Sequence, residues 1–227
     1  MTTRHEFLAS LHEVVKPRGY LEIGVLFGDS LHLAKCPAIG IDPEPRLRYH
    51  QPSAQVFATT SDEFFGRVSF SSDGDVKYVL DNLDLAFIDG QHLFEYALRD
   101  FQNVERYANE RTVIVFDDVL PRNQHEAARA QCPGDWTGDV WKVPKLLQTN
   151  RPRLHQHWVN TDPTGTYVVY GFEPDGRRDD IYSRIRDLGL EAWETVPDDV
   201  INREEAVDPL DALEQIADYM LTLKTQE

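Results

Sequence analysis

Three aspartates follow two apolar segments of this sequence, and they are the residues best suited to carry chemistry. Asp89 ends the segment LAFID, and Asp117 and Asp118 follow VIVF. Such apolar runs predict buried parallel strands, whose neighbouring ends meet at one edge of a sheet. Three carboxylates so close to one another cannot all stay ionised without a large cost in free energy. A hard divalent cation such as Mg²⁺ would offset their repulsion. The alternative is that all three only cap loops or helices.

A second group of residues surrounds a glycine-containing turn. The segment EIGVLFGDS places Glu22, Gly24 and Gly28 at the end of a strand and before an expected helix over 30–35. Glycines let the backbone approach a ligand, and Asp42, which ends the next strand, could accept both hydroxyls of a ribose. The G-x-x-x-G spacing and the lack of a phosphate-loop lysine disfavour a dinucleotide. We therefore expect a nucleoside with a small zwitterionic tail, the alternative being a tight turn without a ligand.

The elements that must position these residues alternate along the chain. Apolar spacing predicts strands over 20–24, 38–42, 56–58, 83–89 and 112–116, with helices over 3–16, 94–107 and from residue 61. Segments 154–159 and 167–172 read as a hairpin that closes the sheet edge. The expected fold class is α/β: a doubly wound, Rossmann-like, mostly parallel sheet with an antiparallel C-terminal hairpin edge and helices on both faces.

The chain is expected to hold one such domain over residues 1–175 and a helical extension over 176–227. A lid-like loop with some helix over about 119–145 contains Trp136 and Trp141, which either close over an acceptor or anchor a rigid loop. The extension carries one apolar stripe, which would pack on the domain or at the interface of a homo-oligomer, most simply a dimer. The stripe comprises Leu210, Leu213, Ile216, Met220 and Leu223.

Composition excludes several classes of partner. The 227 residues include 23 Lys and Arg against 39 Asp and Glu, a net charge of −16. That balance argues against binding nucleic acid or an anionic membrane surface. No apolar run is long enough to span a membrane, and Glu6 and Glu13 interrupt any signal-peptide core. Two cysteines make no disulfide framework, so we expect a cytoplasmic protein.

The segment LEIGVLFGDS resembles motif I of the class I S-adenosylmethionine-dependent methyltransferases, and IGIDPEP resembles their acidic ribose-binding motif. This resemblance implies S-adenosyl-L-methionine as cofactor. By it, Gly24 and Gly28 would line the methionine part and Ser30 would lie near its carboxylate. Asp42 would bind the ribose, and Ser61 with Asp62 would lie by the adenine. Ser61 and Asp62 are equally well explained as the start of a helix.

The pattern of one strand-end aspartate and then an aspartate pair resembles the metal site of cation-dependent O-methyltransferases, including the catechol type. The string FIDGQHLFEYALRDF…VIVFDDVLP is more specifically similar to the branch that methylates sugar hydroxyls of macrolides, aminocoumarins and mycobacterial methylmannose polysaccharides. The resemblance covers residues 20–175. It implies Mg²⁺-dependent methyl transfer to a hydroxyl of a small or oligosaccharide acceptor. A catechol or phenol acceptor, and a non-catalytic cofactor-binding protein, stay open.

Methyl transfer to a hydroxyl requires a base, and three residues are candidates. His92 comes first, because it lies three residues after Asp89, where the catechol-type enzymes carry lysine, and because imidazole titrates near neutral pH. Asp89 is the competing base and His125 the third. The alternative for His92 is a structural bond to a backbone carbonyl. His155 and His157 form an H-x-H pair that reads as exposed strand residues, since no third zinc ligand is in view.

Overall fold

The computed structural model describes residues 2–68, 74–173 and 179–225. A seven-stranded sheet with the order β3-β2-β1-β4-β5-β7-β6 forms its centre. The first five strands are parallel, and β7 and β6 run antiparallel at one edge. The strands are β1 (Gly19–Ile23), β2 (Ala38–Asp42), β3 (Ala54–Ala58), β4 (Leu83–Ile88), β5 (Val113–Phe116), β6 (His155–Val159) and β7 (Thr166–Tyr170). The expected doubly wound α/β fold with an antiparallel hairpin edge is confirmed.

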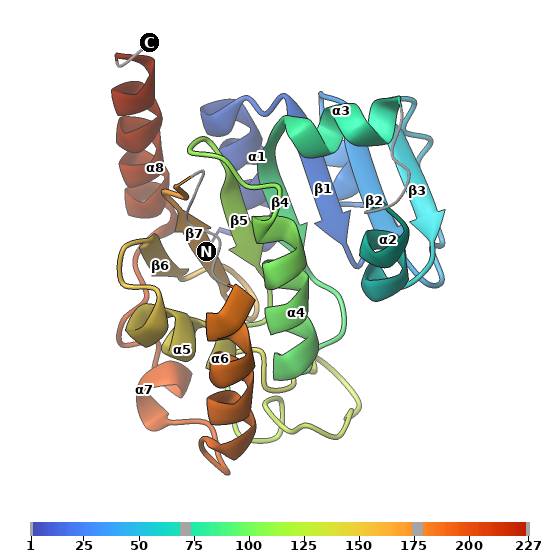
Figure 1. Cartoon of the computed structure of the whole chain (residues 1–227). Helices are drawn as coiled ribbons and strands as arrows, with labels where there is room; N and C mark the ends of the chain where they lie inside the picture. Colours follow the sequence, from blue (N-terminus) through green and yellow to red (C-terminus); the bar gives the residue numbers. More distant parts are fainter. Residues whose placement is uncertain (1, 69–73, 174–178, 226–227) are drawn as a thin grey trace.

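Helices cover both faces of this sheet (Figure 1). They are α1 (Arg4–Val15), α2 (Ser61–Val68), α3 (Asp75–Asp81), α4 (Phe94–Glu105), α5 (Lys142–Asn150), α6 (Asp179–Glu191), α7 (Asp198–Ile201) and α8 (Pro209–Lys224). Strand residues alternate between the two layers, as period-2 geometry requires. In β5, Val113 and Val115 pack with α1 and α8, whereas Ile114 and Phe116 pack with α4 and its neighbours.

The C-terminal helix α8 packs against α1. Ala212, Ile216 and Met220 are buried in the same apolar cluster as Phe7 and Leu8. Of the stripe expected from the sequence, Leu213 and Leu223 pack partly against this cluster, and Leu210 is 67% exposed. Helix α8 therefore packs on the domain with one face.

Register brings the chemically important strand ends level with one another. Ile23 pairs with Ile88, and Ile88 pairs with Phe116, so the next residues, Asp89 and Asp117, leave the sheet side by side. Because all of the parallel strands point the same way, their carboxyl ends share the edge at which the arrowheads lie in Figure 1. The fold thus places Asp89, Asp117 and Asp118 at one edge of the sheet.

Three local features differ from the sequence-based expectation. The helix expected over 30–35 is wrong: only a single 3-10 turn, Leu31–Leu33, forms there. The chain must enter β2 at Ala38, which leaves too few residues for a longer helix. Helix α3 was not predicted, and α5, which starts at Lys142 in the segment expected as a loop with some helix, continues beyond that segment to Asn150.

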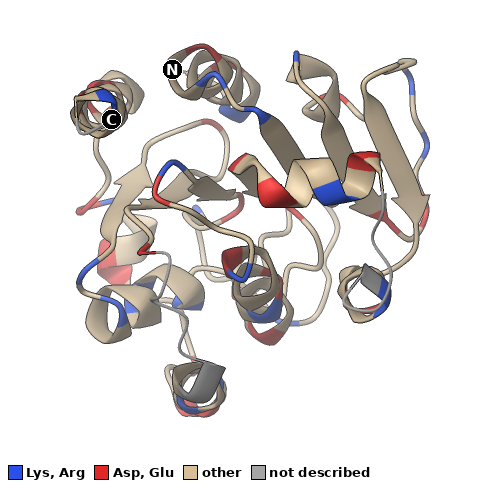
Figure 2. Ribbon diagram, turned by 45° about the horizontal axis from the view of Figure 1, so that its top comes forward, with Lys and Arg blue, Asp and Glu red and all other residues tan. Residues whose placement is uncertain are grey.

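The charges are interspersed over the surface. Figure 2 shows acidic and basic stretches alternating along helices and loops, with no element basic throughout. Within the part of the chain that the structure describes, no helix is both long and apolar enough to cross a lipid bilayer.

Candidate functional site

A cavity of about 520 Å³ lies at the carboxyl ends of the five parallel strands. Segments that follow each of these strands contribute to its wall, and helices α1 and α4 complete it. This is the position at which open α/β sheets bind their ligands. The lining residues are Arg4, Ile23, Gly24, Leu26, Ile41, Asp42, Pro43, Thr59, Thr60, Ser61, Asp62, Asp89, Gly90, Gln91, His92, Tyr96, Asp100 and Asp118.

Asp42 lies in the wall of this cavity, at the end of β2. Its Oδ2 accepts a hydrogen bond of 2.8 Å from the Leu26 N–H, and its Oδ1 accepts one of 2.7 Å from the Glu44 N–H. The carboxylate therefore ties the loop after β1 to the loop after β2. Each oxygen retains a second lone pair, so Asp42 can also accept a ligand hydroxyl.

The two motif glycines have different surroundings. Gly24 adopts a φ of +89° and lines the cavity, and a Cβ there would lie 1.8 Å from the Asp89 carbonyl oxygen. Gly28 also has a positive φ, of +78°, but its Cβ position faces the Leu47 side chain, and the residue does not line the cavity. Gly24 therefore allows close packing of the turn after β1 against Asp89, and it also lies in the cavity wall, where the sequence predicted it.

Glu22 and Ser30 lie beneath the cavity and do not line it. The Glu22 carboxyl is fully buried and accepts hydrogen bonds from the Tyr20 hydroxyl (2.7 Å) and from Ser30 Oγ (2.8 Å). Burial raises the pKa of Glu22 to about 8, against the lowering effect of these two bonds. The pair supports the turn after β1 from below.

The far end of the cavity is built by α2 and α4. Ser61 Oγ donates a 2.5 Å hydrogen bond to Asp100 Oδ1, and Asp62 forms a 2.7 Å ion pair with Arg99. Burial raises the pKa of Asp100 to about 7. Sequence reasoning missed Asp100, although its position among the apolar residues of the α4 stripe, between Ala97 and Val104, signals a buried carboxyl group.

Asp89, His92 and Asp118 form a compact group in the cavity wall. One ligand atom from each lies within 4.8 Å of the others. His92 Nε2 is 3.5 Å from Asp89 Oδ1, and His92 Nδ1 is 3.2 Å from Asp118 Oδ2. Two carboxylates and an imidazole are a suitable donor set for a divalent cation. Sequence reasoning had named both aspartates as ligands but had given His92 a different role.

Asp118 is held in an unusual backbone conformation. Its φ is +59°, in the left-handed region that non-glycine residues seldom adopt, and its Oδ1 accepts a 2.5 Å hydrogen bond from Thr164 Oγ1. Burial and the charge of Asp89 raise the pKa of Asp118 to about 6, although the charge of His92 lowers it. The strained backbone turns this carboxylate toward His92.

Asp117, by contrast, does not belong to this group, although the sequence predicted it as a third ligand. Its side chain is 1% exposed and forms an ion pair with Arg4 of helix α1 through Oδ2. Its Oδ1 is buried without a hydrogen-bond partner among the described residues. Burial and the charges of Asp118 and Asp89 raise the pKa of Asp117 well above its ordinary value. This unsatisfied oxygen beside two further carboxylates fits a cation-binding region.

His92 is fixed by the loop that follows β5. Its Nδ1 lies 2.6 Å from the Trp136 carbonyl oxygen, and the Trp136 indole stacks on its ring at 5.3 Å. Gly138 touches the His92 backbone so closely that a Cβ would lie 1.6 Å from the His92 carbonyl oxygen. Burial lowers the pKa of His92, but hydrogen bonding to Asp89 and the charges of Asp118 and Asp89 raise it to about 9.

A second cavity, of about 470 Å³, adjoins the first. Arg4, His92 and Asp118 line both cavities and form their common wall. The rest of the second cavity comes from the N-terminal segment, the loop after β5 and the β6–β7 turn. Those residues are Thr3, His5, Gln131, Gly134, Asp135, Trp136, Asp162, Pro163 and Thr164.

The remaining candidates from the sequence lie elsewhere. His125 is exposed in the loop after β5 and lines neither cavity. His155 and His157 both stack on Tyr170 of the neighbouring strand, at 4.8 Å and 5.7 Å. Among the described residues, neither histidine belongs to a group that could hold a metal ion. Of the two tryptophans, Trp141 is buried in the core, whereas Trp136 lines the second cavity.

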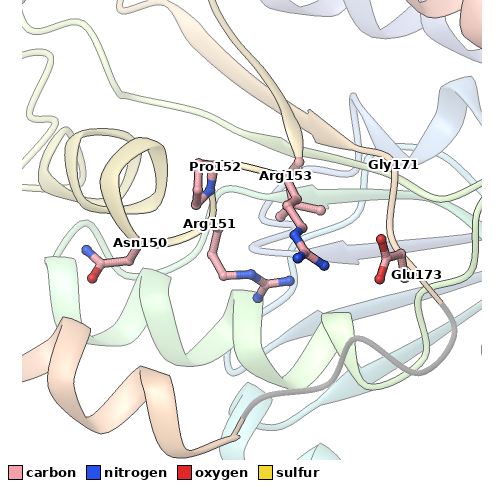
Figure 3. Close-up of a pocket in the computed structure, with 7 residues that line it drawn as sticks. Asn150, Arg151, Pro152, Arg153, Gly171 and Glu173 are labelled. Atoms are coloured by element: carbon pink, nitrogen blue, oxygen red, sulfur yellow. The ribbon is translucent and has the colours of Figure 1, made fainter.

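A small cavity of about 120 Å³ at the end of α5 is separate from this site (Figure 3). Arg151 and Arg153 extend into it, with Glu173 on its opposite side. Arg151 forms a 2.5 Å ion pair with Glu105 and bonds the Tyr182 hydroxyl. Its guanidinium therefore joins α4, α5 and α6, which is a structural role.

Part of the chain matches a known protein family. Residues 21–119 match the family described as a methyltransferase domain, and this segment contains β1 through β5. No curated protein matches the chain.

Solved structures share the fold at low sequence identity. The O-methyltransferase from Bacillus cereus in complex with SAH is 14% identical, with a TM-score of 0.51, over 73% of this chain and 79% of that one. TomG from Streptomyces achromogenes, an O-methyltransferase in complex with SAM, is 15% identical, with a TM-score of 0.51, over 74% and 79%. MycE of the mycinamycin pathway, with Mg and SAH, is 15% identical, with a TM-score of 0.50, over 77% of this chain and 52% of that one. The chain therefore has the Rossmann-like fold of these methyltransferases.

Proposed function

We propose that this protein is an S-adenosylmethionine-dependent, Mg²⁺-dependent O-methyltransferase that acts on a hydroxyl of a sugar or glycoside. The observation that carries the proposal is the common wall of the two cavities. The first cavity has the strand-end position and the acidic residue that a nucleoside cofactor requires. The second meets it at Arg4, His92 and Asp118, where a methyl group could pass from a cofactor to an acceptor.

The residues of the first cavity suit S-adenosylmethionine from one end to the other. Asp42 has lone pairs for a ribose, and Ser61 and Asp100 offer polar groups at the far end. Gly24 lies at the other end, beside the backbone of Asp89. Solved structures of this fold hold SAH or SAM. An S-adenosylmethionine sulfonium supplies an electrophilic methyl group, so the protein's task is to orient and deprotonate the acceptor oxygen.

The acidic group has the donors to hold Mg²⁺, and MycE, of the same fold, was solved with Mg. Asp89 and Asp118 would hold the cation, with His92 adjacent. Mg²⁺, when bound, acts as a Lewis acid that lowers the pKa of an acceptor hydroxyl and fixes its direction. Thr164 and the strained backbone of Asp118 keep one carboxylate in place, which reduces the reorganisation needed during the reaction.

His92 is the proposed base, with Asp89 as the alternative. The Trp136 carbonyl accepts from Nδ1–H, which directs Nε2 toward Asp89 and the common wall. His92 can accept a proton only when it is neutral, and its raised pKa makes that form scarce at neutral pH. His125 is exposed and lines neither cavity, so we do not assign it this role.

The second cavity favours a sugar over a phenol. Its wall offers carboxylates at Asp118, Asp135 and Asp162, an amide at Gln131 and one indole face at Trp136. Carboxylates and amides accept hydrogen bonds from several hydroxyls of one molecule, and an indole stacks on a sugar ring. Three carboxylates also disfavour an anionic acceptor, such as a phosphate ester or a sugar acid.

The test is transfer of labelled methyl from S-adenosylmethionine to a panel of neutral glycosides, sugar acids and catechols, with Mg²⁺ or with EDTA. We expect transfer to a neutral glycoside with Mg²⁺, and none with EDTA or in Asp118→Asn. Transfer to catechols alone would show that the acceptor is a phenol and not a sugar. Cofactor binding without transfer to any acceptor would favour a non-catalytic binding protein.

A further inference from the structure

The N-terminal segment is attached to the rim of the second cavity by backbone hydrogen bonds. The Asp162 N–H donates to the Thr2 carbonyl oxygen (2.9 Å), and the Arg4 N–H donates to the Asp162 carbonyl oxygen (3.1 Å). Thr3 and Glu6 then form a reciprocal capping box at the start of α1. Residues 2–6 are thus fixed in place, and the side chain that they deliver to the common wall is that of Arg4.

Arg4 occupies a position where its charge is locally unfavourable. It is the first residue of α1, and a helix N-terminus favours acidic side chains and disfavours basic ones. Its guanidinium binds Asp117, which follows β5, and its Nη1 lies 4.0 Å from Oδ2 of Asp89, which follows β4. The carboxylates that Arg4 contacts explain why a basic residue is found at this helix N-terminus.

Arg4 occupies space beside the carboxylates and neutralises part of the negative charge that would attract a cation. It binds Oδ2 of Asp117, whereas Oδ1 of the same carboxylate stays buried and unpaired. Asp89, the carboxylate next to it, belongs to the group formed with His92 and Asp118. A divalent cation held by that group would lie near a fixed positive charge, and like charges repel strongly where water is excluded.

We infer that Arg4 is a built-in counter-ion that competes with a divalent cation for the carboxylate group and so sets the cation affinity of the site. This inference rests on the proposed function, because it takes Asp89 and Asp118 as the residues that hold the cation. Arg4 lies outside residues 21–119, so the matched methyltransferase domain does not contain it. As a positioning residue, it neutralises Asp117 and keeps the cation exchangeable.

The experiment measures Mn²⁺ binding directly, by calorimetry and by the electron paramagnetic resonance of free Mn²⁺, in the full-length protein. Arg4→Gln removes the charge and keeps hydrogen-bonding capacity. Arg4→Lys keeps the charge and tests whether charge or shape matters. Lys77→Gln is the matched control, because it removes one positive charge from an exposed pair on α3, with Asp81. Circular dichroism and thermal unfolding show whether each variant is folded.

We expect Arg4→Gln to bind Mn²⁺ at least about tenfold more tightly than the wild type, a difference of about 1.4 kcal/mol. Arg4→Lys and Lys77→Gln should stay within about threefold of the wild type, as expected for a charge effect confined to the site. Equal tightening in Arg4→Lys would overturn the inference, since the cause would then be shape.

Two negative results separate the inference from the proposed function. If the wild type binds Mn²⁺ and Arg4→Gln binds no more tightly, the counter-ion role is wrong and the cation site stands. If neither protein binds Mn²⁺, the cation site itself is wrong, and with it the counter-ion role. Should Arg4→Gln not fold, Arg4→Met, which also removes the charge and keeps a long side chain, carries the same prediction of binding at least about tenfold tighter, and unchanged binding in it contradicts the inference.

Discussion

Asp139 links the loop after β5 to the start of α4, and its replacement by asparagine should destabilise the protein measurably. The carboxylate accepts 2.8 Å and 2.5 Å hydrogen bonds from the Phe94 N–H and from Arg129 Nη1. It also lies 3.3 Å from Lys142 Nζ, whose side chain is only 6% exposed. Asparagine can keep the bond to Phe94 but leaves the buried ammonium of Lys142 with the Gly189 carbonyl oxygen as its remaining hydrogen-bond partner.

Loss of one partner of a buried ion pair costs about 3–5 kcal/mol. Because the Phe94 and Gly189 bonds survive, we expect Asp139→Asn to lower the free energy of unfolding by about 2–4 kcal/mol. In a chain of this length that corresponds to a melting temperature lower by roughly 5–12 °C.

The assay is urea and thermal unfolding followed by circular dichroism, with Asp135→Asn as the control. Asp135 lies in the same loop, but its pair with Arg122 is exposed on both sides, so its loss should cost less than about 1 kcal/mol. Equal effects of the two substitutions, or none from Asp139→Asn, would refute the assignment of Asp139 as the anchor of this loop.

Two further predictions concern pH. Because the buried Glu22 has its pKa raised to about 8, it holds a proton in the folded state that it loses in the unfolded chain, so the free energy of unfolding should fall as the pH rises from about 4.5 to 8. Glu22→Gln should remove up to about 1.4 kcal/mol per pH unit of that slope in urea titrations, and an unchanged slope would contradict the buried, protonated state. If His92 is the base, its pKa of about 9 predicts a methyl-transfer rate that rises with pH, by up to about tenfold per unit, through the neutral range. A rate that does not vary between about pH 6.5 and 8.5 would indicate that Asp89, and not His92, accepts the proton from the acceptor hydroxyl.

The fold was predictable because each buried strand has an unambiguous apolar run. The strand β5, with the residues VIVF, shows the continuous pattern of a strand covered on both faces, and the alternation of strands and helices fixed the parallel sheet. Helix α3 was missed because its seven residues, DVKYVLD, give too short an apolar pattern. The expected helix over 30–35 is wrong because so short a segment between two strands cannot stabilise an α-helix, and a single 3-10 turn forms there instead.

The site was predictable only as far as strand ends reveal it. Register brings Asp89 next to Asp117, which the sequence could indicate from two aligned apolar runs. The direction of the Asp117 side chain could not be inferred, because it depends on Arg4, which is more than a hundred residues away in the chain. The hydrogen bond and ring contact between Trp136 and His92 also could not be inferred, because they depend on the path of a long loop, which tertiary packing determines.

Calorimetric titration with S-adenosylhomocysteine tests the central claim most directly. We expect one molecule to bind per chain both with Mg²⁺ and with EDTA, because the cofactor cavity does not depend on the cation. In Asp42→Ala the affinity should fall at least about tenfold, since the ribose would lose its charged partner. Absence of binding by the wild type under both conditions would contradict the methyltransferase assignment, and the carboxylates at the strand ends would need another explanation.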